Sequence, residues 1–336
     1  MKWNRLCRTS FNIVLLFFAL LNTRHSSADV DVNMVPENTP IFVTVTYPAP
    51  HSEINTILLG ESIRAFGGSM ANAPIWCMVP EYGKALSESF RERASALNID
   101  VIPFEAKPEI VRFFFAADIE AAALAESLAI GKAKTLIWLS SNTLILHEPS
   151  EFILPQDRNL GYRPVHHTNV GSLYDNPLDE FWALVYQSCG VREDYVFPMR
   201  THVDDNIIRP YFNAGILVTR PEQALLRRWK DTFLGLYREP QFLELYKKDN
   251  RYHIFIHQAL LSGIILSSFS KNEIYELPPT YNYPIHLYAE DTTEFRPQAI
   301  DDLITIRHEN FYLEEDWRQK IPFGDRLKHW LIERIE

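Results

Sequence analysis

The sequence predicts one α/β domain in which helices flank a mostly parallel central sheet. Apolar residues make up 46% of the 336 residues, which is ample for a sizeable core. In the first half, short runs of apolar and β-branched residues alternate with segments of helical periodicity. Such alternation is typical of a parallel sheet with helices on both faces. No linker divides the two halves, and no segment is repeated.

The strands and helices of the first half are predicted from these runs. Ser52 is expected to cap the first helix, which ends at Gly67. An Ala-rich segment over residues 117–130, with Gly131 after it, predicts another helix. Between them lies a helix with apolar residues at helical spacing: Leu86, Phe90, Ala94 and Leu97. The predicted strands cover residues 41–46, 75–79, 101–104 and 135–139.

The second half is less regular. A helix begins at Pro177, and another begins at Pro221 after a strand over residues 213–218. Residues 255–266 are apolar enough for a buried helix, and a charged amphipathic tail begins at Trp317.

The carboxyl ends of the predicted strands are the expected place for a site. In open parallel sheets, ligands bind just beyond these ends. The ends lie at Tyr47, at Glu81 and in the turn 140–142. We therefore expect a pocket near Tyr47, Ser140 and Asn213.

Residues 1–28 have the pattern of a secretory signal peptide. Basic residues precede an apolar run over residues 11–21, and small residues end the segment at Ala28. Residues 29–40 read as a linker, and residues 41–336 as the single domain. The sequence thus predicts an exported protein (secreted, periplasmic or in the lumen of the secretory pathway) with no membrane insertion after cleavage. A membrane anchor formed by the same N-terminal segment is the alternative.

The chain is acidic, with 33 Lys and Arg against 43 Asp and Glu and a net charge of −10. The predicted signal peptide holds four basic residues and no acidic one, so its removal changes the net charge to −14. Nucleic acid is therefore excluded as a partner, because its binding needs a basic surface. An exported protein could pair Cys77 with Cys189, but Cys77 lies in a predicted strand, where a buried free thiol is ordinary.

Four motifs follow these elements along the chain. Residues 138–146 are similar to a segment that normally reads Leu-Asp-x-Asp-Thr, and residues 211–218 resemble a Phe-Asn-small-Gly strand. Residues 257–261 resemble a helix start of the form acidic-Gln-x-x-Leu, and residues 277–283 a Leu-Pro…Tyr-Asn segment. In order and spacing, the four resemble GT-A fold nucleotide-sugar glycosyltransferases, and family 8 of these enzymes in particular.

The resemblance implies a GT-A-like domain that transfers a sugar from a nucleotide-sugar donor to a glycan or other acceptor. In these enzymes the Asp-x-Asp pair holds a divalent metal, manganese or magnesium, that bridges the two phosphates. The resemblance also implies that Asn213 and Gly215 line the substrates and that Tyr281 and Asn282 lie near them. His308 stands where some members place a metal-binding His.

The sequence departs from this pattern at the metal-binding positions. Ser140 and Asn142 replace the two acids of the pair, and His257 replaces a third acid. Magnesium and manganese prefer charged oxygen ligands, whereas a hydroxyl and an amide offer neutral ones. We therefore predict no tight metal site and no certain cofactor. A divalent metal held by other residues stays open.

Polar clusters near the motifs supply candidate catalytic residues. His166 and His167 are adjacent and could bind a sugar or, with a distant acid, a metal; neighbouring side chains of a strand point to opposite faces, so at most one reaches a given ion. Asp205, within the stretch 202–206, is a candidate base or else part of a solvated turn. His167 and Asp205 are the candidate catalytic pair.

Binding candidates come from the strand ends and from the arginines. Arg163, Arg209 and Arg220 could clamp a diphosphate, or could be ordinary surface residues. A Gly in a strand, such as Gly215, often marks the close approach of a ligand or of backbone. The predicted substrate-binding residues are Tyr47, Ser140, Asn142, Arg163, Asn213, Gly215, Tyr281 and Asn282.

Two functions fit the sequence. The first is an exported or lumenal glycosyltransferase that works with little or no help from a metal. The second is a catalytically inactive GT-A-like protein that binds a glycan or a protein partner. The lost acids and the predicted export favour the second, whereas the retained Asn-Ala-Gly and Tyr-Asn-Tyr segments favour the first. We expect the first.

Overall fold

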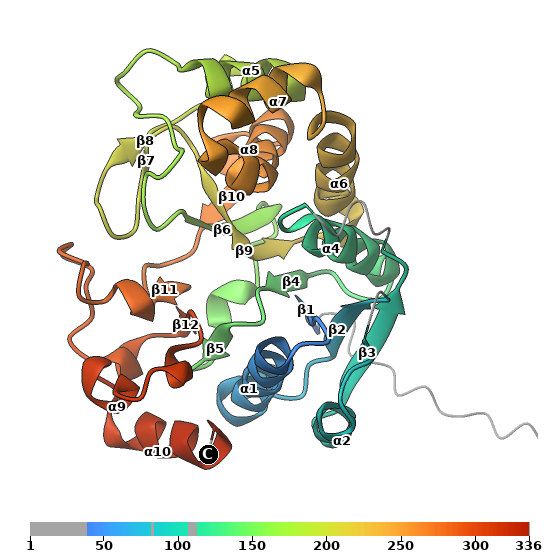
Figure 1. Cartoon of the computed structure of the whole chain (residues 1–336), viewed down its shortest axis with the longest axis vertical. Coiled ribbons are helices and arrows are strands. Elements are labelled where there is room, and N and C mark those ends of the chain that lie inside the picture. Colours follow the sequence, from blue (N-terminus) through green and yellow to red (C-terminus); the bar gives the residue numbers. More distant parts are fainter. Residues whose placement is uncertain (1–38, 82–83, 107–112, 336) are drawn as a thin grey trace, which may run out of the picture. The chain divides into compact units, whose positions relative to one another are not determined.

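A seven-stranded sheet lies at the centre of the computed structural model (Figure 1). Its order is β10-β6-β9-β4-β1-β2-β3, and every strand runs in the same direction except β9, which is antiparallel to β4 and β6. The predicted α/β class, with a mostly parallel central sheet and flanking helices, is confirmed. The strands are β1 (Ile41–Val45), β2 (Ile75–Pro80), β3 (Ile99–Phe104), β4 (Leu136–Leu139), β6 (Leu160–Pro164), β9 (Phe212–Thr219) and β10 (Ile274–Glu276).

The structure describes residues 39–81, 84–106 and 113–335. Residues Pro36–Glu336 form one compact unit. The predicted signal peptide and nearly all of the predicted linker lie outside the described residues. In the part of the chain that is described, no helix is both long and apolar enough to cross a membrane.

Alternating residues of β1 divide the core between the two faces of the sheet. Val43 packs in a cluster with α4 (Ala116–Ala129), α6 (Leu225–Leu236) and α8 (Asn250–Ser268). Phe42 packs in a second cluster with α1 (Pro50–Phe66) and α2 (Glu88–Ala96). Figure 1 shows these two groups of helices on opposite sides of the strands. Full burial of one such aliphatic side chain stabilises the fold by roughly 1.5–3 kcal/mol.

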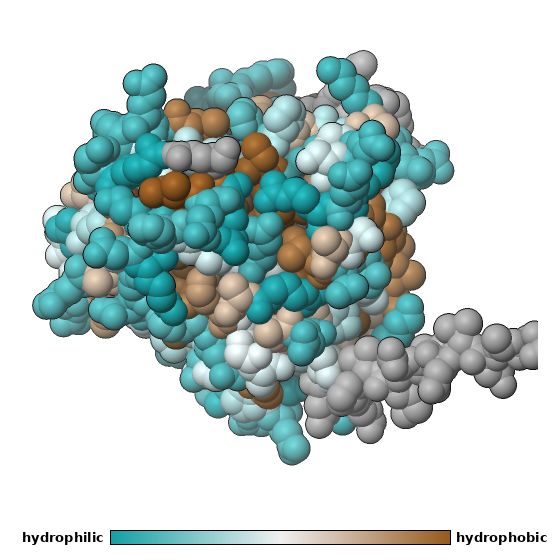
Figure 2. All heavy atoms as spheres, turned by 90° about the horizontal axis from the view of Figure 1, so that it is seen from below, coloured by the Kyte–Doolittle hydropathy of each residue, from teal (hydrophilic) through white to brown (hydrophobic). Residues whose placement is uncertain are grey.

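The remaining elements extend this arrangement. Helices α5 (Glu180–Cys189) and α7 (Pro240–Lys248) pack on α8. A hairpin of β7 (Met199–Arg200) and β8 (Ile207–Ile208) follows α5 in the chain. Hydrophilic side chains cover most of the face in Figure 2, and hydrophobic ones lie between them in small patches.

A second, three-stranded sheet brings the C-terminal part of the chain to the carboxyl end of β4. It consists of β11 (Tyr283–Pro284), β12 (Thr305–Arg307) and β5 (Thr143–Ile145), in that order. Its apolar side chains pack in a third cluster with α9 (Trp317–Lys320) and α10 (Asp325–Ile335). Because β5 follows β4 after a short turn, pairing of β12 with β5 places residue 307 next to that turn.

Two details of the prediction are settled by the structure. The first helix begins at Pro50 with Ala49 as its N-cap residue, so the prediction that Ser52 caps it is wrong. The Ser52 hydroxyl instead accepts a hydrogen bond from the backbone N–H of Tyr47 at 2.9 Å. Cys77 and Cys189 are both free thiols.

The start of α6 is held by a buried carboxylate from α4. The N-cap residue of α6, Ala224, has no side chain that can cap the helix. Glu126 is fully buried and accepts hydrogen bonds from the backbone N–H groups of Leu226 at 3.0 Å and Arg227 at 2.9 Å. Glu126 thus caps the N-terminus of α6 from the neighbouring helix α4.

We predict that Glu126→Ala lowers the free energy of unfolding by roughly 2–3 kcal/mol, because two backbone donors lose a charged acceptor. Urea unfolding followed by circular dichroism measures the change. Glu222→Ala, at an exposed position near the same helix start, is the control and should shift stability by less than about 0.5 kcal/mol. Equal effects of the two variants would contradict the capping role.

Candidate active site

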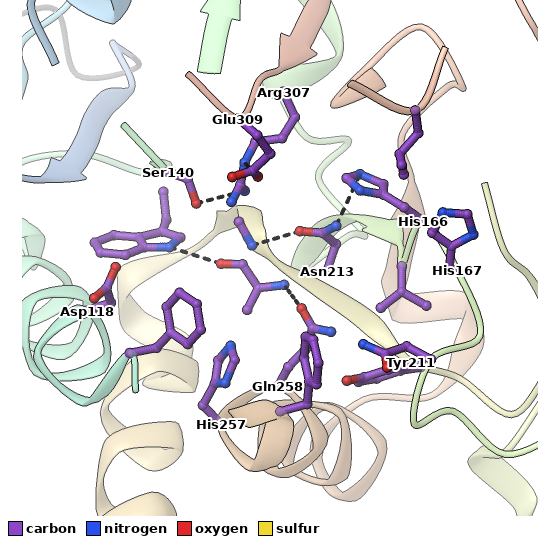
Figure 3. A pocket seen from close by; sticks show the side chains of 18 of the residues that line it. Asp118, Ser140, His166, His167, Tyr211, Asn213, His257, Gln258, Arg307 and Glu309 are labelled. Carbon is purple, nitrogen blue, oxygen red and sulfur yellow. Dashed lines mark hydrogen bonds and ion pairs between the residues drawn. The ribbon is translucent and has the colours of Figure 1, made fainter. Parts of the chain in front are cut away.

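A cavity of about 350 Å³ opens at the carboxyl ends of β4 and β6, where β9 begins (Figure 3). Its volume lies in the range of small-molecule sites. The sheet contributes its floor, α4 and α8 contribute one wall, and residues 286–287 and 307–309 contribute another. The predicted pocket near Ser140 and Asn213 is therefore present.

The floor of the cavity is the beginning of β9, and side chains from three directions fix its backbone. The Asn213 amide oxygen accepts from the N–H of Gly215 at 2.9 Å. The Gln258 side chain, from α8, accepts from the N–H of Ala214 at 2.9 Å. The Trp138 indole, from β4, donates to the carbonyl of Ala214 at 3.1 Å. A floor held in this way is preorganised for a ligand.

Arg307 lies over this floor. Its Nη1 donates to the Ser140 hydroxyl at 3.0 Å, and its Nε lies 3.7 Å from a carboxylate oxygen of Glu309. Gly215 faces the guanidinium, and a Cβ at that position would overlap Nη1. The group that approaches Gly215 closely is thus the Arg307 side chain, whereas the sequence predicted a ligand or backbone. Burial lowers the pKa of Arg307, and the neighbouring carboxylates of Glu309 and Asp118 oppose that shift.

Asp118, in the first turn of α4, is the carboxylate at the opposite side of the cavity (Figure 3). The Tyr47 hydroxyl donates to it. Burial raises the pKa of Asp118 to about 6, while the hydrogen bond from Tyr47 and the charge of Arg307 act in the other direction. A carboxyl group with this pKa can exchange a proton near neutral pH.

Phe115 precedes α4 and lines the same part of the cavity. Its φ of 60° lies in the left-handed region, which a bulky residue rarely adopts. Its ring lies on that of His257, with 4.3 Å between the centroids. Burial lowers the pKa of His257 to about 4, so this imidazole is neutral at physiological pH.

Histidines form the far side of the cavity. The Nε2 atom of His166 lies 3.3 Å from the amide nitrogens of both Asn213 and Asn282. Burial first, and then the nearby His202 and Arg307, hold the pKa of His166 well below its usual value. His166 is therefore a neutral group that positions Asn213. Both adjacent histidines line the cavity, so the prediction that at most one of them reaches a given ion stays a prediction.

His167 lies at the rim. Its ring nitrogens are 3.8 Å from carboxylate oxygens of Asp204 and Glu290, and about a third of its side chain is exposed. Asp204 is itself held by the backbone N–H of Thr168 at 2.9 Å. A histidine between two carboxylates at a cavity rim can bind a hydroxyl group or take up its proton.

The structure brings several of the predicted residues to the cavity and places others just behind its lining. Ser140, His167, Asn213 and Gly215 line it directly. Tyr47 and Asn282 lie behind it and contact Asp118 and His166, and the Asn142 amide donates to Glu309 at 3.4 Å.

Three predicted residues lie elsewhere. Asp205 adopts a left-handed φ of 56° in an exposed turn, and its carboxylate pairs with Arg200 at 2.6 Å. Arg163 is 3% exposed and donates to the carbonyl of Leu277 at 2.7 Å. It therefore has a structural role, because it joins β6 to the segment after β10. The hydroxyl of Tyr281 accepts from the backbone N–H of Glu151.

The arginine clamp predicted from the sequence is not formed by Arg209 and Arg220 either. Arg209 donates to the Asn176 carbonyl at 2.7 Å, and Arg220 donates to the Arg158 carbonyl at 2.8 Å. The cation at the cavity is Arg307, which sequence reasoning missed together with Asp118 and Glu309. The one available signal was a charged residue at the end of an apolar strand, Ile304-Thr305-Ile306-Arg307.

The cavity does not fit a divalent metal at the turn after β4. Ser140 and Asn142 offer neutral oxygens, and the Ser140 hydroxyl already accepts from the Arg307 cation. His308 is fully buried, and its backbone N–H donates to the Asn142 carbonyl at 2.9 Å. Throughout the described residues, no group of three or more His, Cys, Asp or Glu side chains could hold a metal ion.

In comparison with known proteins, one family model matches the chain, no curated protein matches it, and the similar solved structures include two of the galactosyltransferase LgtC. A crystal structure of the galactosyltransferase LgtC with donor and acceptor sugar analogues has a TM-score of 0.46 at 14% identity, covering 88% of this chain and 95% of LgtC. An active-site mutant of LgtC has a TM-score of 0.47 at 13% identity, covering 87% and 95%. Scores of this size say nothing of this chain's activity.

Residues 43–261, well over half of the chain, match the Rhodobacterales glycosyltransferase domain. This match confirms the resemblance that the motifs predict, and the chain belongs to the Rhodobacterales glycosyltransferase domain family.

Proposed function

We propose that the cavity binds a nucleotide sugar and that the protein transfers its sugar to a glycan or other acceptor, without a tightly bound divalent metal. The observation that carries the proposal is the convergence of Asn213, Gly215, Arg307 and Asp118 on one cavity at the carboxyl ends of the strands. Family membership supports the reaction class. The nature of the sugar and of the acceptor is left to experiment.

Sugar transfer requires the site to stabilise two opposite charges and to accept a proton. Transfer breaks the bond between the anomeric carbon of the sugar and an oxygen of the diphosphate. A new bond joins that carbon to the oxygen of the acceptor hydroxyl, which loses its proton. The leaving diphosphate gains negative charge, so it needs a cation or oriented donors nearby. The sugar gains positive charge, and an anionic group such as the Asp118 carboxylate stabilises it or takes the acceptor proton.

The remaining residues have positioning roles in this proposal. Asn213 forms the surface under the donor sugar, Gly215 leaves room for Arg307 beside it, and His167 at the rim faces the acceptor. Tyr47 holds the Asp118 carboxylate, and Asn282 holds His166 beside Asn213.

The first test is calorimetric titration of the purified protein with UDP, GDP, ADP and CDP and with their hexose conjugates, in EDTA and with manganese. We expect at least one donor to bind in EDTA, and the nucleoside diphosphate to be released when an acceptor is added. A folded protein that binds none of these compounds would rule out the transferase.

A catalytically inactive protein that binds a glycan or a protein partner is the second candidate. The observation in its favour is the absence of the acidic residues at Ser140, Asn142 and His257. Sugar release separates the two candidates: a transferase consumes its donor when an acceptor is present, whereas an inactive relative leaves every bound donor intact.

Asp118 predicts the pH dependence of transfer. Its pKa is raised to about 6, so the carboxylate loses its charge as the pH falls through 6, and the rate should fall with it. Tyr47→Phe removes a hydrogen bond that favours the charged form, so the midpoint should move to higher pH. Asp118→Asn should lower kcat by roughly 10²–10⁴-fold and abolish this midpoint. Rate profiles from pH 4.5 to pH 8.5 measure both effects, and an unchanged midpoint in Tyr47→Phe would argue against Asp118.

Export is also part of the proposal and rests on the pattern of residues 1–28. Expression of the whole chain in a secreting host, followed by N-terminal sequencing, should give a protein that begins at Asp29. A product that keeps Met1 and sediments with membranes would instead support the anchor.

A further inference from the structure

The backbone of Arg307 is fixed by strand pairing and by a backbone hydrogen bond next to the turn that follows β4. In the antiparallel pair of β12 and β5, Arg307 lies opposite Thr143. One residue further on, the N–H of His308 donates to the carbonyl of Asn142 at 2.9 Å. These backbone contacts fix the position of residue 307 next to the turn. The Ser140 hydroxyl, which accepts a hydrogen bond from Nη1 at 3.0 Å, fixes the orientation of the guanidinium.

The cavity is shaped around this cation. Gly215 is the residue directly beneath it, and any side chain there would displace Nη1. The side chain of Arg307 is only 19% exposed, and burial is the first cause that lowers its pKa. A guanidinium keeps its charge under such conditions, so the cavity holds a permanent cation.

The charge of Arg307 is only partly compensated by the protein. Its Nε has no hydrogen-bond acceptor among the described residues, and the nearest carboxylate, that of half-exposed Glu309, lies 3.7 Å away. The second carboxylate near it, Asp118, has a raised pKa and carries its charge only above about pH 6. A largely buried cation whose ion pair is long and half-exposed attracts a further anion, because the surroundings screen the cation weakly.

We infer that Arg307 supplies the positive charge that holds the diphosphate of the donor, in the place where a divalent metal does not fit. The inference rests on the proposed function and adds the residue that makes metal unnecessary. The planar guanidinium donates two parallel N–H bonds to phosphate oxygens, a geometry that an ammonium group lacks. Gly215 and Ser140 then serve to seat this arginine.

The test is calorimetry in EDTA with UDP, GDP, ADP, CDP and inorganic pyrophosphate. The wild-type protein should bind at least one of the nucleoside diphosphates, and Arg307→Met should weaken that binding on the order of 10- to 100-fold. Arg307→Lys keeps the charge without the planar fork, so its loss should be smaller. Gly215→Ala leaves the arginine in the sequence but crowds its guanidinium, and should weaken binding like Arg307→Met.

Arg200→Met is the matched control. Arg200 lies in the turn with Asp205, outside the cavity, and its removal should leave binding unchanged. The melting temperature of each variant shows whether it is folded. If Arg307→Met does not fold, Arg307→Lys and Gly215→Ala decide the question.

The outcomes separate this inference from the proposed function. Binding by the wild type only when manganese is present would overturn the role of Arg307 and leave the transferase standing. Unweakened binding by folded Arg307→Met or Gly215→Ala would do the same. If the folded wild-type protein binds no nucleoside diphosphate with or without metal, both proposals fail.

Discussion

The site depends on the position of one strand, the antiparallel β9, which pairs with both β4 and β6. Because β9 runs against its neighbours, its first residues lie where they end, which brings the Asn213–Gly215 segment to the ligand-binding edge of the sheet. The N–H of Ser140 donates to the Gly215 carbonyl at 2.9 Å, and that of Val165 donates to the Tyr211 carbonyl at 3.1 Å. A parallel strand in the same position would have brought its opposite end there.

The cavity also concentrates ionisable groups where charge is costly. Burial raises the pKa of Asp118, lowers that of Arg307 and keeps His166 neutral. The guanidinium loses most of its water when the chain folds. The free-energy cost of this desolvation therefore belongs to folding and does not weaken ligand binding. The small residues Gly215 and Ser140 leave room for the guanidinium at this buried position.

Most of the sheet could be predicted, because apolar periodicity is local: neighbouring residues such as Phe42 and Val43 need only face opposite layers. The order of the motifs also located Asn213 and Gly215. Arg307 could not be found in this way, since it meets Ser140 only through strand pairing between distant segments. Asp205 was misplaced because a left-handed turn directs it outward, and no local pattern tells which of two adjacent acids faces inward.

The position of β12 along the chain has a consequence for relatives of this protein. The segment shared with the family ends at residue 261, whereas Arg307, Glu309 and His286 all follow it. The matched segment thus supplies the floor of the cavity and the Asp118 carboxylate, and the C-terminal segment supplies Arg307 and Glu309. The match over residues 43–261 therefore does not extend to the cation that lies over the floor. A relative that matches only this segment need not carry a counterpart of Arg307, so the match alone does not predict which anion such a relative binds.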